Sequence, residues 1–190
     1  MTKDRLCAFM DAILAIIMTI LVLELKKPAE ASWSALWALR ADFFSYAVSF
    51  FWLGAMWVNI HNRWVSVERI DNKVLWASIV MLFFASFFPY VTSFVSENFE
   101  NLFAQMFYSV IVMLVSFANM ALSRAIVNIN KTAGEAIKGT QKIVAADLAI
   151  KGIGILMGIF IYPPFAMIGI ILAGCVMTFL PLYLNKHKQQ

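Results

Sequence analysis

The sequence predicts an all-α membrane protein in which residues 1–190 form a single domain of six transmembrane helices. Of its 190 residues, 62% are hydrophobic and only 14% are charged, with a mean hydropathy of +0.80. A soluble domain of this size is far less apolar. Apolar windows long enough to cross about 30 Å of hydrocarbon recur along the chain. They predict helices at about residues 7–25, 38–60, 74–95, 103–127, 141–162 and 164–184.

The first predicted span carries two charges at its start, Arg5 and Asp11. It is then apolar from Ala12 to Leu23, with Thr19 as its one hydroxyl. A charged side chain inside a membrane helix costs roughly 2.5–3.5 kcal/mol on insertion scales, so it is usually held for a partner or a pathway. The same charges distinguish this span from a cleaved signal peptide. We therefore expect Arg5 and Asp11 to pair with other parts of the chain.

Partners for these charges are expected near the second and third spans. Asn59 and His61 end the second span on the side of the membrane where Asp11 lies, and a carboxylate at this depth needs donors. Asp71 precedes the third span, where it could receive Arg5 or cap the helix. His61 could equally be a wet interfacial residue or, less favoured, a pH sensor.

The fifth span contains Asp147 and Lys151, which are four residues apart and therefore lie on one face of a helix. They predict an ion pair, with a proton or ion relay as the functional alternative. Gly154 and Gly158 have the spacing of a close helix contact. The two prolines at 163–164 then break the chain, so the fifth and sixth spans should form an antiparallel hairpin.

The Lys and Arg residues outside the spans predict the orientation. Eleven flank one side of the membrane, and three (Lys26, Lys27 and Arg40) flank the other. Because positive residues are enriched in cytoplasmic loops, both termini are expected in the cytoplasm. The net charge of +4 then reflects topology and predicts no nucleic-acid partner. Cys7 and Cys175 both lie in predicted spans and predict neither a disulfide nor a metal site.

Beyond Asp11, the first span presents Ile16, Thr19 and Leu23 on one face, with Ile20 beside them. In a lone helix this stripe would face lipid or pack, and the Thr19 hydroxyl would bond to the carbonyl four residues earlier. Around a shared axis, several copies would instead form a narrow apolar pore with one ring of hydroxyls. One helix cannot enclose a pore, so the second interpretation requires a cyclic oligomer.

The chain resembles the lysosomal potassium channel family (transmembrane protein 175) and its prokaryotic homologues. Arg5, Phe9 and Asp11 are similar to the family's first-helix signature, except that Met10 stands where the family has a serine. This exchange removes one hydroxyl from the surroundings of Asp11. The resemblance continues through the closing Lys26-Lys27-Pro28 and through residues 57–61, 71–76 and 88–93.

The resemblance implies a homotetramer with six helices per subunit, in which the first helices line the pore. It implies that Ile16 forms the hydrophobic constriction, Thr19 the hydroxyl layer tied to potassium selectivity, and Leu23 the next hydrophobic layer. Potassium would rest transiently near Thr19, and no other cofactor or metal is expected. The sequence independently lacks a Thr-Val-Gly-Tyr-Gly run typical of carbonyl-lined filters.

We therefore expect a potassium-permeable cation channel in a prokaryotic cell membrane, with the bilayer and monovalent cations as its partners. Arg5 and Asp11 would hold the first helix against Asn59 and His61. The alternative is a proton-coupled secondary transporter that uses Asp147, Lys151 and His61. An enzyme is not expected, because two histidines supply neither a nucleophile with its base nor a metal cluster.

Overall fold

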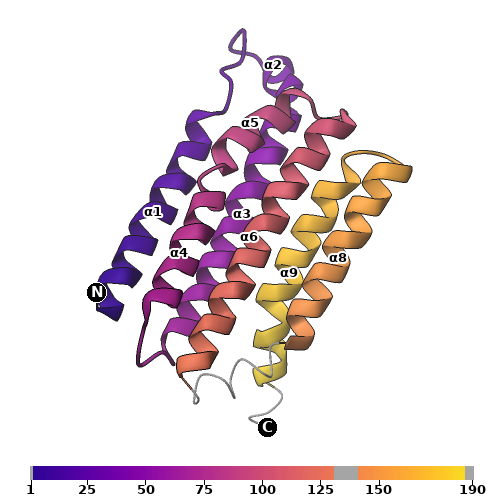
Figure 1. The fold of residues 1–190 in the computed structure, drawn as a ribbon. Helices are drawn as coiled ribbons and strands as arrows, with labels where there is room; N and C mark the ends of the chain where they lie inside the picture. Colours follow the sequence, from indigo (N-terminus) through magenta and orange to yellow (C-terminus); the bar gives the residue numbers. More distant parts are fainter. Residues whose placement is uncertain (1, 131–140, 187–190) are drawn as a thin grey trace.

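The computed structural model describes residues 2–130 and 141–186, which form an all-helical bundle. Figure 1 shows the long helices running side by side along one axis. The first residue of α1 and the last of α9 lie at the same end, the lower end in Figure 1. The helices are α1 (Lys3–Leu23), α2 (Trp33–Ala38), α3 (Arg40–Trp64), α4 (Asn72–Ala85), α5 (Phe88–Glu97), α6 (Leu102–Ile129), α8 (Gln141–Phe160) and α9 (Phe165–Lys186).

Four segments of the described chain are long and apolar enough to cross a membrane: α1, α3, α4 with α5, and α6. Their mean hydropathies are 2.7, 1.4, 2.0 and 2.0, and the shortest has 21 residues. At 1.5 Å per residue, such a helix covers the hydrocarbon thickness of about 30 Å. α8 and α9 occupy the places of the fifth and sixth predicted spans and run alongside the others (Figure 1).

The span predicted over residues 74–95 is present within residues 72–97, but it consists of two helices and not of one continuous helix. α4 ends at Ala85 and α5 begins at Phe88. Pro89 explains the break, since it has no N–H to donate to the carbonyl of Ala85 and its ring would clash with that carbonyl. The short helix α2 was not predicted either. It is capped by Ser32, whose side chain accepts a hydrogen bond from the Ala35 N–H at 3.2 Å.

The centre of the bundle is an apolar core with aromatic contacts between helices. Trp52 of α3 stacks on Phe88 of α5 with ring centres 5.0 Å apart, and Phe88 meets Tyr108 of α6 edge-on at 5.9 Å. The Tyr108 hydroxyl is buried but satisfied, because it lies 2.9 Å from the Ser49 hydroxyl. α3 thus joins α5 and α6 in the middle of the subunit.

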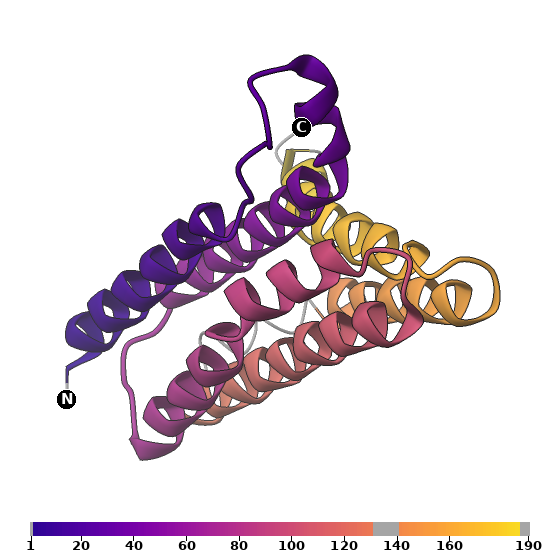
Figure 2. The same ribbon diagram turned by 90° about the horizontal axis from the view of Figure 1, so that it is seen from above.

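Two edges flank this core, as Figure 2 shows from above. α1 forms one edge and packs against α3, α4 and α5. The hairpin of α8 and α9 forms the other, and its close packing at Gly154 and Gly158 confirms the prediction. A Cβ atom on Gly154 would lie 2.7 Å from the Gly169 Cα, and one on Gly158 would lie 3.1 Å from the Ala166 Cβ.

Candidate functional site

The candidate site lies on α1, whose two faces have opposite surroundings. One face is packed into the subunit, and none of its apolar side chains is more than 4% exposed: Leu6, Met10, Leu14, Ile17 and Leu21. The opposite face is exposed, with residues at alternating spacings of four and three: Arg5, Phe9, Ala12, Ile16, Thr19 and Leu23. The Ile16 and Leu23 side chains are 57% and 79% exposed. The subunit alone therefore leaves the predicted stripe uncovered.

Thr19 is the one hydroxyl on this exposed face. Its Oγ1 donates to the carbonyl of Ile16 at 2.8 Å, three residues earlier and not four as expected. A hydroxyl has one hydrogen and two acceptor lone pairs. Because the hydrogen is engaged with the α1 backbone, the exposed oxygen offers lone pairs outward. Thr19 can therefore act as an acceptor toward a cation or water on this face.

Asp11 is held by a residue that the sequence did not single out as its partner. The indole Nε1 of Trp57 donates to the Asp11 Oδ1 at 2.8 Å. The expectation that Asn59 and His61 supply these donors is wrong. The Asn59 amide donates to the carbonyl of Ala55 at 2.8 Å, and the His61 ring lies 5.5 Å from the Trp57 ring. The indole N–H of Trp57 was the signal available in the sequence, because a buried or interfacial Trp usually finds an acceptor for it.

The other charged residues of the first-helix region have separate roles. Asp71 caps α4, because its Oδ1 accepts from the Val74 N–H at 2.9 Å; this confirms one of the two roles expected for it. Arg5 is exposed on the face that carries Ile16 and Thr19. Met10, at the position of the family's serine, is 2% exposed and belongs to the packed face.

Two further polar contacts fix the ends of α1. At its start, the Lys3 ammonium donates to the carbonyl of Val67 at 2.6 Å. Beyond its end, Lys26 pairs with Glu97 of α5 at 3.0 Å. Together with the bond between Asp11 and Trp57, these contacts attach α1 at three levels along its length.

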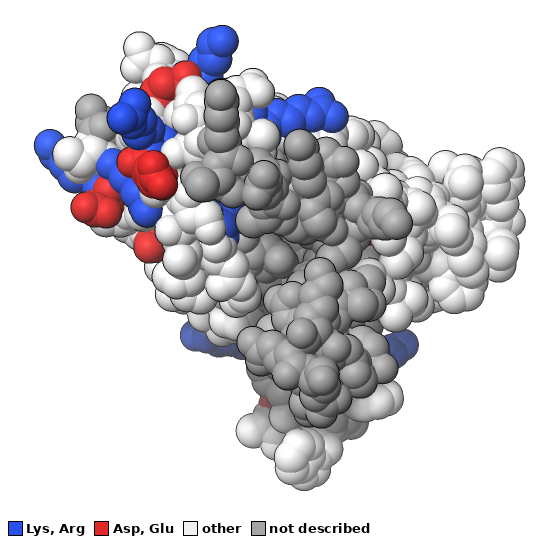
Figure 3. All heavy atoms as spheres, turned by 90° about the horizontal axis from the view of Figure 1, so that it is seen from below, with Lys and Arg blue, Asp and Glu red and all other residues white. Residues whose placement is uncertain are grey.

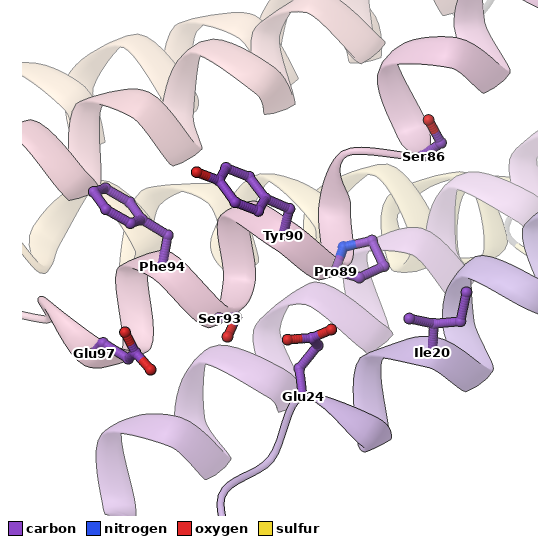
Figure 4. A pocket seen from close by; sticks show the side chains of 8 residues that line it. All are labelled: Ile20, Glu24, Ser86, Pro89, Tyr90, Ser93, Phe94 and Glu97. Carbon is purple, nitrogen blue, oxygen red and sulfur yellow. The ribbon is translucent and has the colours of Figure 1, made fainter.

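A shallow groove of about 470 Å³ lies beside the end of α1. In Figure 4, Ile20 and Glu24 of the α1 side face α5 across this groove. Ile20 is 36% exposed, less than Ile16. Ile20 therefore lies between the groove and the exposed stripe, which agrees with its predicted position beside that stripe. The other lining residues are Ser86, Pro89, Tyr90, Ser93, Phe94 and Glu97.

The predicted ion pair of α8 is confirmed. Lys151 Nζ donates to the Asp147 Oδ2 at 2.7 Å and to the Ser116 hydroxyl of α6 at 2.9 Å, and it lies 5.2 Å from the centre of the Trp52 ring. All three ammonium hydrogens thus have a partner or a ring face available. His61 contacts Trp57 instead, so the described contacts do not unite the three residues expected for a carrier.

Sequence reasoning missed a second cation held between helices, the half-buried Arg63. Its guanidinium, near the end of α3, donates to the Ser123 hydroxyl and to the side-chain Oδ1 of Asn119, both on α6, and to the backbone carbonyl of Asn59. In the sequence, Arg63 is one of the eleven Lys and Arg residues that predict the orientation. The polar residues spaced along α6 were the available signal, since buried polar groups need partners. Within the described chain, no group of three His, Cys, Asp or Glu residues is placed to hold a metal ion.

Comparison with known proteins finds relatives of this chain by sequence. Residues 5–89 match the model of the endosomal/lysosomal potassium channel TMEM175. A potassium channel of Chryseobacterium sp. (strain P1-3) is 41% identical over 98 residues, which cover 52% of this chain and 51% of the relative. A potassium channel of Streptomyces collinus is 32% identical over 99 residues, covering 50% and 48%. The chain thus spans about half the length of the curated relatives it matches.

A solved structure matches almost the whole fold. The crystal structure of a lysosomal potassium-selective channel TMEM175 homolog from Chamaesiphon minutus aligns with a TM-score of 0.72. The alignment covers 99% of this chain and 98% of that chain at 21% sequence identity. At this identity the match establishes the fold, which extends through the α8 and α9 hairpin.

Proposed function

We propose that this integral membrane protein, whose residues 5–89 match the TMEM175 family model, is one subunit of a potassium-permeable cation channel. The observation that carries the proposal is the bare face of α1. Ile16, Thr19 and Leu23 lie exposed on a helix whose opposite face is packed and whose two ends are tied to the subunit. Because α1 is held in this way, its exposed face has a fixed position relative to the rest of the chain.

In the proposed assembly, the exposed face of α1 faces the α1 helices of other copies of the chain. Spacings of four and three along the exposed face give the 3.5-residue repeat at which helices pack around a common axis. The face also begins with Arg5, a charge that lipid would accept only at a cost. We infer a homotetramer in which α8 and α9 are the fifth and sixth spans of each subunit. The proposal includes a prokaryotic cell membrane and cytoplasmic termini, supported by bacterial relatives and by the eleven Lys and Arg residues on one side.

Around the axis, the stripe would form stacked rings. Ile16 and Leu23 supply branched apolar rings that gate by excluding water, and Thr19 supplies a ring of oxygen acceptors between them. A potassium ion would lose part of its water shell there. Because hydroxyl oxygens carry weaker dipoles than stacked carbonyls, the preference for potassium over sodium should be modest. Arg5, Asp11 and Trp57 would set the position of α1 and would not contact the ion.

The deciding experiment is potassium flux from liposomes that contain purified protein. Ile16→Asn replaces the apolar ring with amides, so we expect faster flux. The matched control is Ile153→Asn on α8, where the same residue type is 57% exposed, as Ile16 is. This control should leave flux unchanged. Equal rates for Ile16→Asn and the parent protein would remove Ile16 from the ion path.

A further inference from the structure

Asn130, the residue that follows α6 as its C-cap, makes more hydrogen bonds than capping the helix requires. Its side chain is buried, with 4% of the residue exposed. The Oδ1 accepts from the backbone N–H groups of Glu68 and Arg69, both at 2.9 Å. The Nδ2 donates to the carbonyls of Arg69 at 3.0 Å and Ile126 at 3.1 Å. An amide oxygen can accept two hydrogen bonds and an amide nitrogen can donate two, so the side chain of Asn130 has all of its hydrogen-bonding positions filled.

These bonds hold residues 65–71, the loop between α3 and α4. The loop cannot pair its backbone groups within a helix, and buried backbone groups need partners. Asn130 satisfies three of them from α6. Lys3 of α1 satisfies a fourth, the Val67 carbonyl, at 2.6 Å. The Val67 side chain is itself 2% exposed, so the loop is anchored from three directions.

The loop therefore links the first turn of α1 to Asn130, the residue that caps the end of α6. Lys3 bonds to the backbone of Val67, and Asn130 bonds to the backbone of Glu68 and Arg69. The two side chains therefore hold the same stretch of three residues, 67–69. Figure 3 shows this end of the molecule, where charged side chains gather over one part of the surface. The Lys3 ammonium reaches the loop backbone at Val67.

We propose that Asn130 and Lys3 are positioning residues that set the cytoplasmic mouth of the ion path. They do so by fixing the start of α1, through the loop, at a constant distance from α6. This proposal rests on the proposed function, because it requires α1 to line the path. Neither residue touches the ion. A change in the position of α6 would reach α1 through residues 67–69.

Hydrogen–deuterium exchange tests the link without reference to conduction. In the full-length protein, Asn130→Ala should speed exchange at the amides of Glu68 and Arg69 about tenfold, the effect of losing roughly one buried hydrogen bond. It should also speed exchange at residues 6–10 of α1, as Lys3→Met should. The matched controls are Asn128→Ala, an exposed asparagine two residues earlier on α6, and Lys73→Met, an exposed lysine at the same end. Both controls should match the parent protein.

Potassium flux then tests the consequence. Asn130→Ala and Lys3→Met should change flux in the same direction, and the double variant should differ no more than the stronger single variant, because both act through one loop. Additive effects, or faster exchange at residues 68 and 69 with no change at residues 6–10, would overturn the proposal. If Asn130→Ala does not fold, Lys3→Met at the surface carries the same test. A null result for Ile16→Asn would instead overturn the pore and leave the exchange result standing.

Discussion

The two edges of the bundle are joined to its centre in different ways. In the hairpin of α8 and α9, the backbones touch at Gly154 and Gly169, and a Cβ atom on either would lie under 3 Å from the other's Cα. A buried ion pair between Asp147 and Lys151 adds a connection to α6. Close packing runs along this edge and leaves its helices little freedom to slide.

α1 is attached at separate points instead. Lys3, Asp11 and Lys26 each make one polar contact, and between them one face is packed while the other is bare. Polar contacts at a few positions along α1 fix the position of the helix and leave its exposed face uncovered. The contrast indicates that the α8 and α9 edge serves the stability of the subunit, whereas α1 is placed for contacts outside it.

The largest effect is expected at the buried ion pair. Lys151→Met leaves the Asp147 carboxylate buried without its cation, and breaking a buried pair in this way costs about 3–5 kcal/mol of unfolding free energy. The control at the other edge is Lys26→Met. That salt bridge has side chains 51% and 47% exposed, and such a pair contributes at most about 1 kcal/mol. Thermal unfolding in detergent compares them, and equal losses would contradict the contrast between the edges.

A smaller loss is expected at the glycine contact. A Cβ atom in Gly154→Ala would lie 2.7 Å from the Gly169 Cα, so the two helices must move apart. Such overpacking costs about 1–3 kcal/mol. Gly152→Ala, two residues earlier on α8, is the control, because no atom lies within 4 Å of its added Cβ. The melting temperature should fall for Gly154→Ala alone; a fall of similar size in both would point to the helix backbone and not to the contact.

The smallest change in stability is expected on α1. Trp57→Phe keeps an aromatic side chain but removes the N–H donor to Asp11, a loss of about 1 kcal/mol. Its larger consequence should be functional, since α1 loses its middle attachment, so potassium flux should change while the protein still folds. Trp76→Phe on α4, 63% exposed, is the control and should alter neither stability nor flux. Unchanged flux in Trp57→Phe would show that the contact does not position α1.

The features that could be predicted from the sequence depend on one helix at a time. Apolar windows located the long helices, and a spacing of four residues identified the pair of Asp147 and Lys151. Asp71 was recognisable as a cap because capping is local. For the same reason the break before Pro89 was available from the sequence, although a long apolar window concealed it.

The features that escaped prediction depend on contacts between helices. Trp57, Arg63 and Asn130 all find partners more than 45 residues away in the chain. Several donors near Asp11 had suitable chemistry, and only the rotation of α3 against α1 decides that Trp57 reaches it. Asn130 is an ordinary polar residue at a helix end until the loop of residues 65–71 folds over it. Hydrophobic periodicity predicts which face of a helix is apolar, but it does not predict which residues of another helix that face contacts.

The orientation of the Thr19 hydroxyl has a consequence for the sign of the permeant charge. With its hydrogen donated to Ile16, each Thr19 turns only oxygen toward the bare face. In the proposed homotetramer, a chloride ion beside the four Thr19 hydroxyls would meet no hydrogen-bond donor and would not be solvated there. The C-terminal end of α1 adds the negative end of its helix dipole only one turn farther along. Anions could thus be rejected by neutral groups alone, with no acidic side chain in the stripe.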